Sequence, residues 1–461
     1  MNWHGVLTAM LPEHLLLGGI VALLLLEIAD ARTRGAFAFA LAAVSAAAAA
    51  ALWLHSSGYA AAPFPGHYAV GPAASLAKFL LLALAVPVLL LSRDEFTESR
   101  YFALLLSSLY GACLLVSSTS FMTLFLGLEI LSLPVYALVL IGSERAQGAE
   151  AALKYLVLGG AATATFLMGT SFLYGATGTL GIDAIGIARF TTDPIAATGA
   201  ALIISALFLK AAIVPMHAWA PDAYEAASVP VTAYMAVIIK SAVLLAALQL
   251  FGTTPVPPQA TTLVALLPLA SMVWGNIAAI RQQSFRRLIA YSSIAHAGYL
   301  YFAFLGAGPG RTQTIMFYLA AYGLMTLLAF TALPGRGDDA ARDKLQSFRG
   351  LFHRRPYAAL GIAAAMLSLA GLPPMPGFIA KFLVFRNVVA AGHTGWAVFG
   401  LLASYLGLYL YLRVIQIMFM QSPEGAVQPA QQRRLAWIAA AICVVPAILI
   451  AIAPGWLLDR L

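Results

Sequence analysis

Charged residues are scarce in this sequence: only 10% of its 461 residues are Asp, Glu, Lys or Arg, whereas 62% are hydrophobic. An ordinary soluble domain carries about 25% charged residues, and the mean hydropathy of +0.88 lies equally far from that class. The sequence also lacks any polar segment long enough to fold as a separate domain. These absences exclude a water-soluble protein and predict a polytopic membrane protein, for which the bilayer is the solvent.

Cysteine is nearly absent as well. Cys113 and Cys443 are the only two, and both lie in apolar runs. They exclude a disulfide framework and any cysteine-ligated metal or iron–sulfur centre, so we expect both to be packing residues. The formal net charge of +8 would suit a nucleic-acid partner, but no polar domain exists to carry such a site. We therefore expect no nucleic acid, no metal and no redox centre in this chain.

Long hydrophobic runs fill the sequence instead. A membrane-spanning helix needs about 20 mostly apolar residues, and the sequence predicts fourteen such helices. They are expected near residues 11–29, 35–54, 71–92, 101–117, 121–142, 152–176, 196–215, 229–251, 260–280, 288–306, 314–333, 357–392, 397–420 and 435–458. Because the connecting loops are short, we expect one all-α transmembrane domain over residues 1–461.

The distribution of positive charge in the loops predicts the orientation. Of the 26 Lys and Arg residues, seven lie within spans and three (Arg189, Arg311 and Arg460) lie in loops after even-numbered spans or in the C-terminal tail. The other sixteen lie in loops after odd-numbered spans. Loops rich in Lys and Arg stay in the cytoplasm. We therefore expect loop 334–356 in the cytoplasm of a bacterial inner membrane protein and both termini in the periplasm.

Several charged residues lie well inside the predicted spans. Glu129 is the only charged residue in the stretch 101–143, and four lysines, Lys154, Lys210, Lys240 and Lys381, are similarly deep. Placing one such charge at mid-membrane costs about 2.5–3.5 kcal/mol, so the usual explanation is functional. Burial disfavours the ammonium form of lysine, which therefore binds and releases protons where arginine would stay charged. This set favours a proton relay over a metal site, since lysine is not a usual metal ligand.

The remaining polar groups of the spans have two interpretations each. We expect Lys78 and Arg386 to reach a membrane interface by snorkelling, and Glu27 to be interfacial. Arg413 is equally compatible with pairing and with function. His296 is either a hydrogen-bonded core residue or a member of the relay, and its depth slightly favours the relay.

Two predicted helices contain proline-rich interruptions, at residues 212–216 and 370–377. Proline removes a helical hydrogen bond, and Pro373, Pro374 and Pro376 together with two glycines should break a helix outright. Irregular backbone at membrane depth is tolerated only inside protein or beside a water-filled cavity. The breaks fall in spans seven and twelve, five apart, which predicts two inverted five-helix repeats, residues 101–251 and 260–420, flanked by residues 1–92 and 435–461.

Six patches of the sequence, in order over roughly residues 75–420, resemble the family of NADH-quinone oxidoreductase subunit N. The most specific is Phe-Leu-Gly-Leu-Glu-Ile-Leu-Ser-Leu-Pro-Val-Tyr-Ala-Leu at residues 125–138. The other similar patches are residues 151–159, 174–178, 210–224, 287–296 and 377–382. This family belongs to the antiporter-like membrane subunits of respiratory complex I.

The resemblance implies a fold of fourteen helices with inverted repeats and one proton-conducting path. It also implies roles for single residues: Glu129 matches the glutamate of the fifth helix, and Lys154, Lys210, Lys240 and Lys381 match ionisable residues of the sixth, seventh, eighth and twelfth. Pro373, Pro374 and Pro376 depart from the family pattern. FMN, iron–sulfur clusters and quinone are then expected in other subunits, and the expected partners are subunits M, K and J together with lipid.

Two alternatives stay open at the level of sequence. A subunit of a multisubunit cation/proton antiporter or of a membrane-bound hydrogenase would share the fold and the lysines. A structural spacer that transmits strain without conducting protons would also be compatible with the hydropathy pattern.

Overall fold

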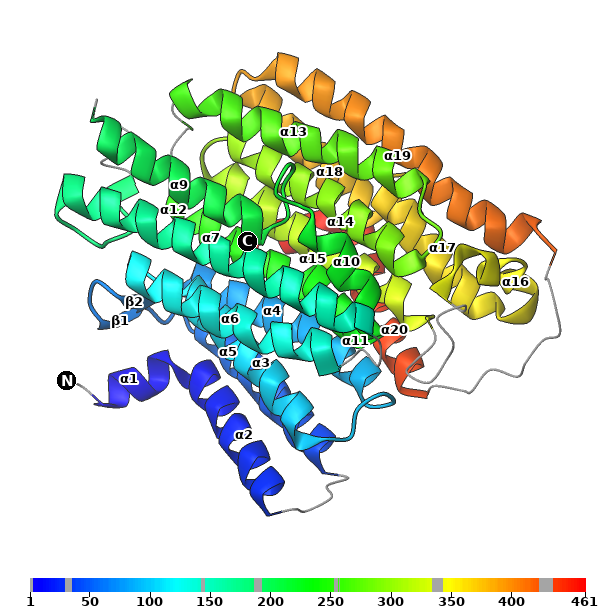
Figure 1. Ribbon diagram of the computed structural model, residues 1–461, viewed down its shortest axis with the longest axis horizontal. Helices are drawn as coiled ribbons and strands as arrows, with labels where there is room; N and C mark the ends of the chain where they lie inside the picture. Colours follow the sequence, from blue (N-terminus) through cyan, green and yellow to red (C-terminus); the bar gives the residue numbers. More distant parts are fainter. Residues whose placement is uncertain are drawn as a thin grey trace. The chain divides into compact units, whose positions relative to one another are not determined.

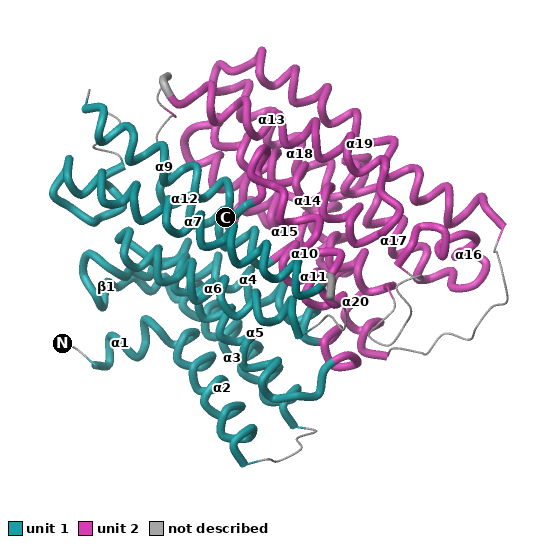
Figure 2. Tube along the Cα trace, viewed as in Figure 1, with its two compact units in different colours: residues 1–89, 96–211, 238–252 teal, residues 90–95, 212–237, 253–461 magenta. Residues whose placement is uncertain are grey.

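The computed structural model describes residues 3–29, 35–141, 146–185, 193–252, 256, 258–333, 343–422 and 434–461. The chain divides into two compact units, which Figure 2 shows in different colours. Unit 1 comprises residues 1–89, 96–211 and 238–252, and unit 2 comprises residues 90–95, 212–237 and 253–461. Apart from residues 90–95, the chain stays in unit 1 up to Ala211. It then enters unit 2, returns to unit 1 for residues 238–252, and completes unit 2.

Unit 1 is a bundle of helices with one small β-hairpin (Figure 1). Its elements are α1 (Trp3–Ala9), α2 (Leu11–Ile28), α3 (Ala36–Ser56), β1 (Ala61–Phe64), β2 (Tyr68–Val70), most of α4 (Pro72–Ser92), α5 (Ser99–Val116), α6 (Phe121–Ile141), α7 (Ala146–Thr177), α9 (Pro194–Lys210) and α12 (Lys240–Phe251). The antiparallel hairpin was not anticipated, and it turns at Pro65-Gly66, where Gly66 has φ +78°.

Unit 2 is also helical. Its elements are α10 (Trp219–Ala226), α11 (Val229–Tyr234), the first part of the π-helix η1 (Met235–Ile239), α13 (Pro258–Ile280), α14 (Phe285–Phe302), η2 (Ala303–Leu305), α15 (Pro309–Thr331), η4 (Leu345–Phe348), α16 (Leu351–Arg354), α17 (Pro356–Ala370), α18 (Pro376–Ala390), α19 (Thr394–Met420), α20 (Arg434–Ile452) and α21 (Pro454–Leu458). Almost every residue of α14 and α15 is buried, so these two helices form its core.

The all-α membrane class predicted from composition is confirmed. In the part of the chain that the structure describes, twelve helices are long and apolar enough to cross a membrane. The two other predicted spans, 196–215 and 357–392, coincide with the shorter helices α9, α17 and α18. The total of fourteen spans and the five-helix repeats stay predictions.

Both predicted interruptions are present as breaks between helices. After α9 ends at Lys210, Ala212 adopts φ +60° and Pro215 follows; after α17 ends at Ala370, Gly371 adopts φ +82° and Pro374 follows. Each break therefore has a left-handed residue three positions before a proline, and each of these prolines is preceded by a cis peptide bond. A left-handed conformation ends an α-helix, and alanine tolerates it less well than glycine does.

Glycines allow α5 and α6 to lie in close contact. A Cβ atom added at Gly111 would meet the backbone of Leu131, and one added at Gly127 would meet the backbone of Leu115. Small residues at helix interfaces permit this approach inside membranes. Because successive helical residues are about 100° apart, Glu129 lies on the opposite side of α6 from Gly127 and Leu131. The contact with α5 thus turns Glu129 toward the other neighbours of α6.

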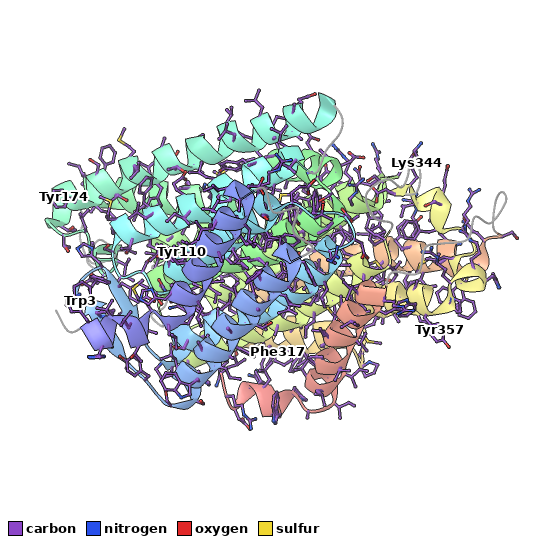
Figure 3. All side chains as sticks on the ribbon, turned by 90° about the horizontal axis from the view of Figure 1, so that it is seen from below. Trp3, Tyr110, Tyr174, Phe317, Lys344 and Tyr357 are labelled. Carbon is purple, nitrogen blue, oxygen red and sulfur yellow. The ribbon has the colours of Figure 1, made fainter. Side chains whose placement is uncertain are left out.

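The outer helices carry apolar side chains on their exposed faces, as a lipid-facing surface requires. On α7 these side chains include Leu153, Val157 and Tyr174, and Figure 3 shows Tyr174 projecting near the end of that helix. Arg386 and Glu27 are exposed, in agreement with an interfacial position, and Cys113 and Cys443 are buried free thiols. Seven of the arginines used to predict the orientation lie outside the described residues: Arg32, Arg34, Arg145, Arg189, Arg336, Arg342 and Arg433.

Candidate functional site

Glu129 and Lys210 form an ion pair inside unit 1. Lys210 Nζ lies 3.4 Å from Glu129 Oε1, and the two side chains are 5% and 22% exposed. Glu129 lies in the middle of α6, whereas Lys210 is the last residue of α9. The separation of 3.4 Å is long for a charge-assisted hydrogen bond, which is usually about 2.7–2.9 Å. The ion pair is therefore longer than a close one, and other polar groups lie within hydrogen-bonding distance of both partners.

Three hydroxyl groups complete the surroundings of this pair. Lys210 Nζ donates to Ser132 Oγ at 3.2 Å and to the Tyr136 hydroxyl at 3.4 Å. Thr163 of α7 donates a short hydrogen bond to Glu129 Oε1. The sequence interpretation missed these residues, although Glu129, Ser132 and Tyr136 follow the i, i+3, i+7 spacing that places side chains on one helix face.

The backbone around Lys210 favours a positive charge. The carbonyl groups of the last helical turn carry partial negative charge, which stabilises a cation at a helix C-terminus. Here the C-terminus is created by the break at Ala212 rather than by a membrane surface. The interrupted helix and the carboxylate of Glu129 thus both act on the same ammonium group.

Lys240 lies at a second irregularity. It is the first residue of α12 and directly follows the π-helical turn of η1, and its side chain is 4% exposed. Insertions of π-helical geometry occur often at functional sites, because they re-aim side chains and disturb the hydrogen-bond ladder. The sequence indicated that Lys240 is deep in the membrane, but it gave no indication of this turn.

His296 lies in a box of tyrosines in unit 2. Its Nδ1 atom is 2.8 Å from the Tyr318 hydroxyl, and its Nε2 atom is 3.2 Å from the Tyr411 hydroxyl. The ring of Tyr322 lies 5.0 Å from the imidazole ring. Both ring nitrogens thus have hydroxyl partners, which can donate or accept, so the imidazole can change tautomer without losing a hydrogen bond.

Lys381 occupies the second helix break. Its ammonium group donates to the carbonyl of Ala370, the last residue of α17, at 3.0 Å and to Ser404 Oγ at 3.3 Å. It also lies over the ring of Tyr299 at 4.7 Å. Tyr299 in turn lies 5.7 Å from the imidazole of His296 between ring centroids. The structure therefore brings Lys381 and His296 to the same tyrosine, inside unit 2.

Lys154 is placed differently from the other three lysines and from His296. It lies on α7 with 45% of its side chain exposed, and it pairs with Glu150 at 2.8 Å, one turn earlier on the same helix. That ion pair lies within α7 itself. Since α7 has 32 residues, about 48 Å of helix against a hydrocarbon core of about 30 Å, its first turns extend toward a membrane surface.

Lys78 and Arg413, which also lie within predicted spans, both have polar partners in the structure. Lys78 was expected to snorkel, and this was wrong: its side chain is 0% exposed and pairs with Glu13 at 2.6 Å. Burial and the Glu13 carboxylate together raise the pKa of Tyr68, in the hairpin, well above its usual value, so Tyr68 remains a donor. Arg413, which the sequence left open, donates to the carbonyl of Ile280 at the end of α13, a structural contact.

The chemistry available here is proton binding and release. Carboxylate, amine, imidazole and phenol groups are present, and no cluster of three or more His, Cys, Asp or Glu side chains suited to a metal occurs among the described residues. A lysine lies at the C-terminal end of each helix that precedes a break. Lys210 is itself the last residue of α9, and the ammonium group of Lys381 donates to the carbonyl of Ala370, the last residue of α17. Half-helix ends of this kind bind the transported cation or proton in repeat-built transporters.

Comparison with known proteins finds a family that matches more than half of the chain. Residues 118–407 match the family described as NADH:quinone oxidoreductase/Mrp antiporter, TM. The chain is 38% identical to NADH-quinone oxidoreductase subunit N of Pelobacter propionicus over 94% of this chain and 93% of that protein. It is also 38% identical to NADH-quinone oxidoreductase subunit 14 of Thermus thermophilus, over 86% of this chain and 87% of that protein.

Solved structures agree with these relatives. A chain of respiratory complex I from Thermus thermophilus is 33% identical, covers 97% of this chain and 98% of its own length, and superposes with a TM-score of 0.84. A chain of the membrane-bound sulfane sulfur reductase, an archaeal respiratory membrane complex, superposes with a TM-score of 0.86 at 24% identity and shares the fold.

Proposed function

Because this chain belongs to the NADH:quinone oxidoreductase/Mrp antiporter family, with subunit N proteins as relatives over most of its length, we propose that it translocates protons as a membrane-arm subunit of NADH:quinone oxidoreductase. The family resemblance stated from the sequence is confirmed by these relatives. Quinone reduction elsewhere in the complex would drive the translocation. FMN, iron–sulfur clusters and quinone are assigned to other subunits.

One observation carries this proposal: the Glu129–Lys210 pair at the end of an interrupted helix. When the pair is closed, the carboxylate stabilises the ammonium form of Lys210. When Glu129 moves away or becomes protonated, Lys210 loses that stabilisation and releases its proton more readily. The long separation of 3.4 Å and the hydroxyl groups of Ser132 and Tyr136 support such opening, because they leave Lys210 hydrogen-bonded in either state.

We propose that Lys240, His296 and Lys381 carry the proton onward. In unit 2 the Tyr322 hydroxyl donates to the carbonyl of Ala236, four residues before Lys240 in the sequence, and its ring lies against His296. Tyr299 then lies between His296 and Lys381. Coupled titration of such groups is expected, since each protonation changes the field at the next site. Lys154 stays a predicted member of the proton relay, and its exposed position favours a role at the outer face of α7.

The two helix breaks support the inverted repeats, residues 101–251 and 260–420. Ala212 and Gly371 share the left-handed conformation at the same distance before a proline, and an ammonium group lies at each preceding helix end. With its flanking segments 1–92 and 435–461, the chain is then one transmembrane domain in a bacterial inner membrane. We propose subunits M, K and J and lipid as its neighbours.

Substitution of Glu129 tests the proton-binding role of the pair. We expect Glu129→Gln to slow NADH-driven proton uptake into inverted membrane vesicles severalfold, because an amide cannot change charge. Glu129→Asp should retain most of the rate, since it keeps a titratable carboxylate. Glu27→Gln is the matched control, because Glu27 is an exposed glutamate on α2. Near-wild-type uptake in both Glu129 variants would favour the alternative of a non-conducting spacer.

The orientation has its own test. From the excess of positive charge in loops after odd-numbered spans, we expect the C-terminus in the periplasm. A phosphatase that is active only in the periplasm, fused after Leu461, should therefore be active, and a fluorescent protein that matures only in the cytoplasm should be dark. The reverse pattern would contradict both the orientation and the count of fourteen spans.

A further inference from the structure

A second buried ion pair lies in unit 1, on helices that the relay above does not use. Glu13 is in the first turn of α2 and Lys78 is in the second turn of α4, and both side chains are 0% exposed. Lys78 Nζ lies 2.6 Å from Glu13 Oε1 and donates to the Tyr68 hydroxyl at 2.7 Å. Tyr68 donates to the same Glu13 oxygen at 2.8 Å. We call these three residues the N-terminal triad.

The Glu13 carboxylate uses only one of its two oxygens. Oε1 receives both hydrogen bonds of the triad, whereas Oε2 is buried and has no hydrogen-bond partner among the residues that the structure describes. Tyr110 and Cys113 of α5 lie within its electrostatic reach. A carboxylate oxygen with no hydrogen-bond donor is a position to which a proton can add, because a protonated carboxyl group presents one O–H donor and keeps its other acceptor lone pairs.

The hairpin is also held by hydrogen bonds outside the triad. Ala69 N–H donates to the carbonyl of Ser117 at 3.0 Å, and Thr123 Oγ1 donates to the carbonyl of His67 at 2.7 Å. These contacts attach the hairpin to the junction between α5 and α6. Replacing a buried ion pair by apolar side chains of similar volume is often neutral or stabilising. A pair retained inside a membrane protein is therefore better explained by function.

The same contacts link the triad to the helix that carries Glu129. His67, next to Tyr68, is hydrogen-bonded through Nδ1 to Ser120 Oγ at 3.1 Å, just before α6 begins. Thr123 lies in the first turn of α6, six residues before Glu129, about 9 Å along the helix. A series of polar groups thus leads from the triad to the start of α6.

We propose that Glu13 is a second proton-binding residue of unit 1, on the side of the membrane where α2 and α4 begin, and that Lys78 and Tyr68 position its carboxylate. In this step a proton adds to Glu13 Oε2, so an O–H bond forms and the carboxylate becomes neutral, while Oε1 keeps its contacts to Lys78 and Tyr68. Release reverses the step, and no electron moves. The inference rests on the proposed function, since a proton must reach the site.

The test uses the whole complex in sealed vesicles. Glu13→Gln removes the titratable group and keeps the shape, and the double variant Glu13→Leu with Lys78→Met replaces the pair by apolar side chains. Glu27→Gln on the exposed end of the same helix is the matched control. The measurements are protons translocated per NADH oxidised, and the carbonyl stretch of a protonated carboxyl group in infrared difference spectra recorded during turnover.

We expect both Glu13 variants to assemble, and to lower the proton-to-NADH ratio at least as much as Glu129→Gln does. The carboxyl band should disappear in Glu13→Gln and persist in Glu27→Gln. A double variant with the wild-type ratio would show that the pair is only structural, and so would failure of both Glu13 variants to assemble. If Glu129→Gln also leaves the ratio unchanged, the proposed function itself fails, which separates the two hypotheses.

Discussion

Replacing Lys210 with methionine should lower NADH-driven proton translocation by at least about tenfold, equivalent to about 1.4 kcal/mol in a rate-limiting barrier. Methionine has a similar length but cannot bind a proton, and it leaves the half-buried Glu129 without its cation. Lys210→Arg should be almost as impaired. Arginine keeps the ion pair with Glu129, but it does not release its proton in proteins.

The comparison of the two Lys210 variants separates titration from simple ion pairing. Proton uptake into inverted vesicles, normalised to the amount of assembled complex, is the measurement. Lys344→Met is the matched control, because Lys344 is an exposed lysine in the segment before α16 and is labelled in Figure 3. Full activity of Lys210→Arg would show that a fixed positive charge suffices, and the release step proposed for Lys210 would be wrong.

The class of the fold and the ionisable residues inside the spans could be predicted from the sequence, and both for the same physical reason. In a membrane, apolar length and the cost of buried charge are both properties of local sequence, so hydropathy identified the spans and made Glu129, Lys210, Lys240 and Lys381 conspicuous. The breaks were equally local, because proline and glycine disrupt a helix wherever they occur. Both breaks lie where the prolines predicted them, after Lys210 and after Ala370.

What the sequence could not show depends on contacts between distant segments. The two tyrosines that are hydrogen-bonded to His296 come from α15 and α19, 22 and 115 residues away. Hydropathy does not distinguish a tyrosine that offers a hydroxyl from one that only packs. Glu13 and Lys78 each lie near the end of a predicted span, where a charge normally reaches water. In the structure the two residues pair with each other, and Tyr68 of the hairpin is hydrogen-bonded to both.

Lys154 lies in a helix that is longer than its predicted span. The apolar run 152–176 placed this residue inside a span, but α7 begins six residues earlier and extends beyond the length of a bilayer. A lysine in the first turns of such a helix reaches a membrane surface without much cost, and here it pairs with an exposed glutamate. Lys154 is therefore half-exposed, whereas Lys210, Lys240 and Lys381 are buried.

Lys381→Met is expected to lower proton translocation about as strongly as Lys210→Met, again by about tenfold. The ammonium group of Lys381 lies at the end of α17, held by the carbonyl of Ala370 and the hydroxyl of Ser404, so its removal leaves the second interrupted helix without a cation. Lys381→His, which restores a titratable nitrogen on a shorter side chain, should recover part of the rate. The measurement is the same vesicle assay, with NADH oxidation recorded in parallel.

A variant of Tyr299 then tests whether the route from His296 to Lys381 uses a hydroxyl or only a ring. The Tyr299 ring lies beneath the Lys381 ammonium group at 4.7 Å, a cation–π contact that phenylalanine would preserve. If the ring only holds Lys381 in place, Tyr299→Phe keeps the wild-type rate; if the hydroxyl passes the proton, the rate falls toward that of Lys381→Met. Wild-type translocation in Lys381→Met itself would remove Lys381 from the proposed path, because the proton would then leave the chain before reaching the second helix break.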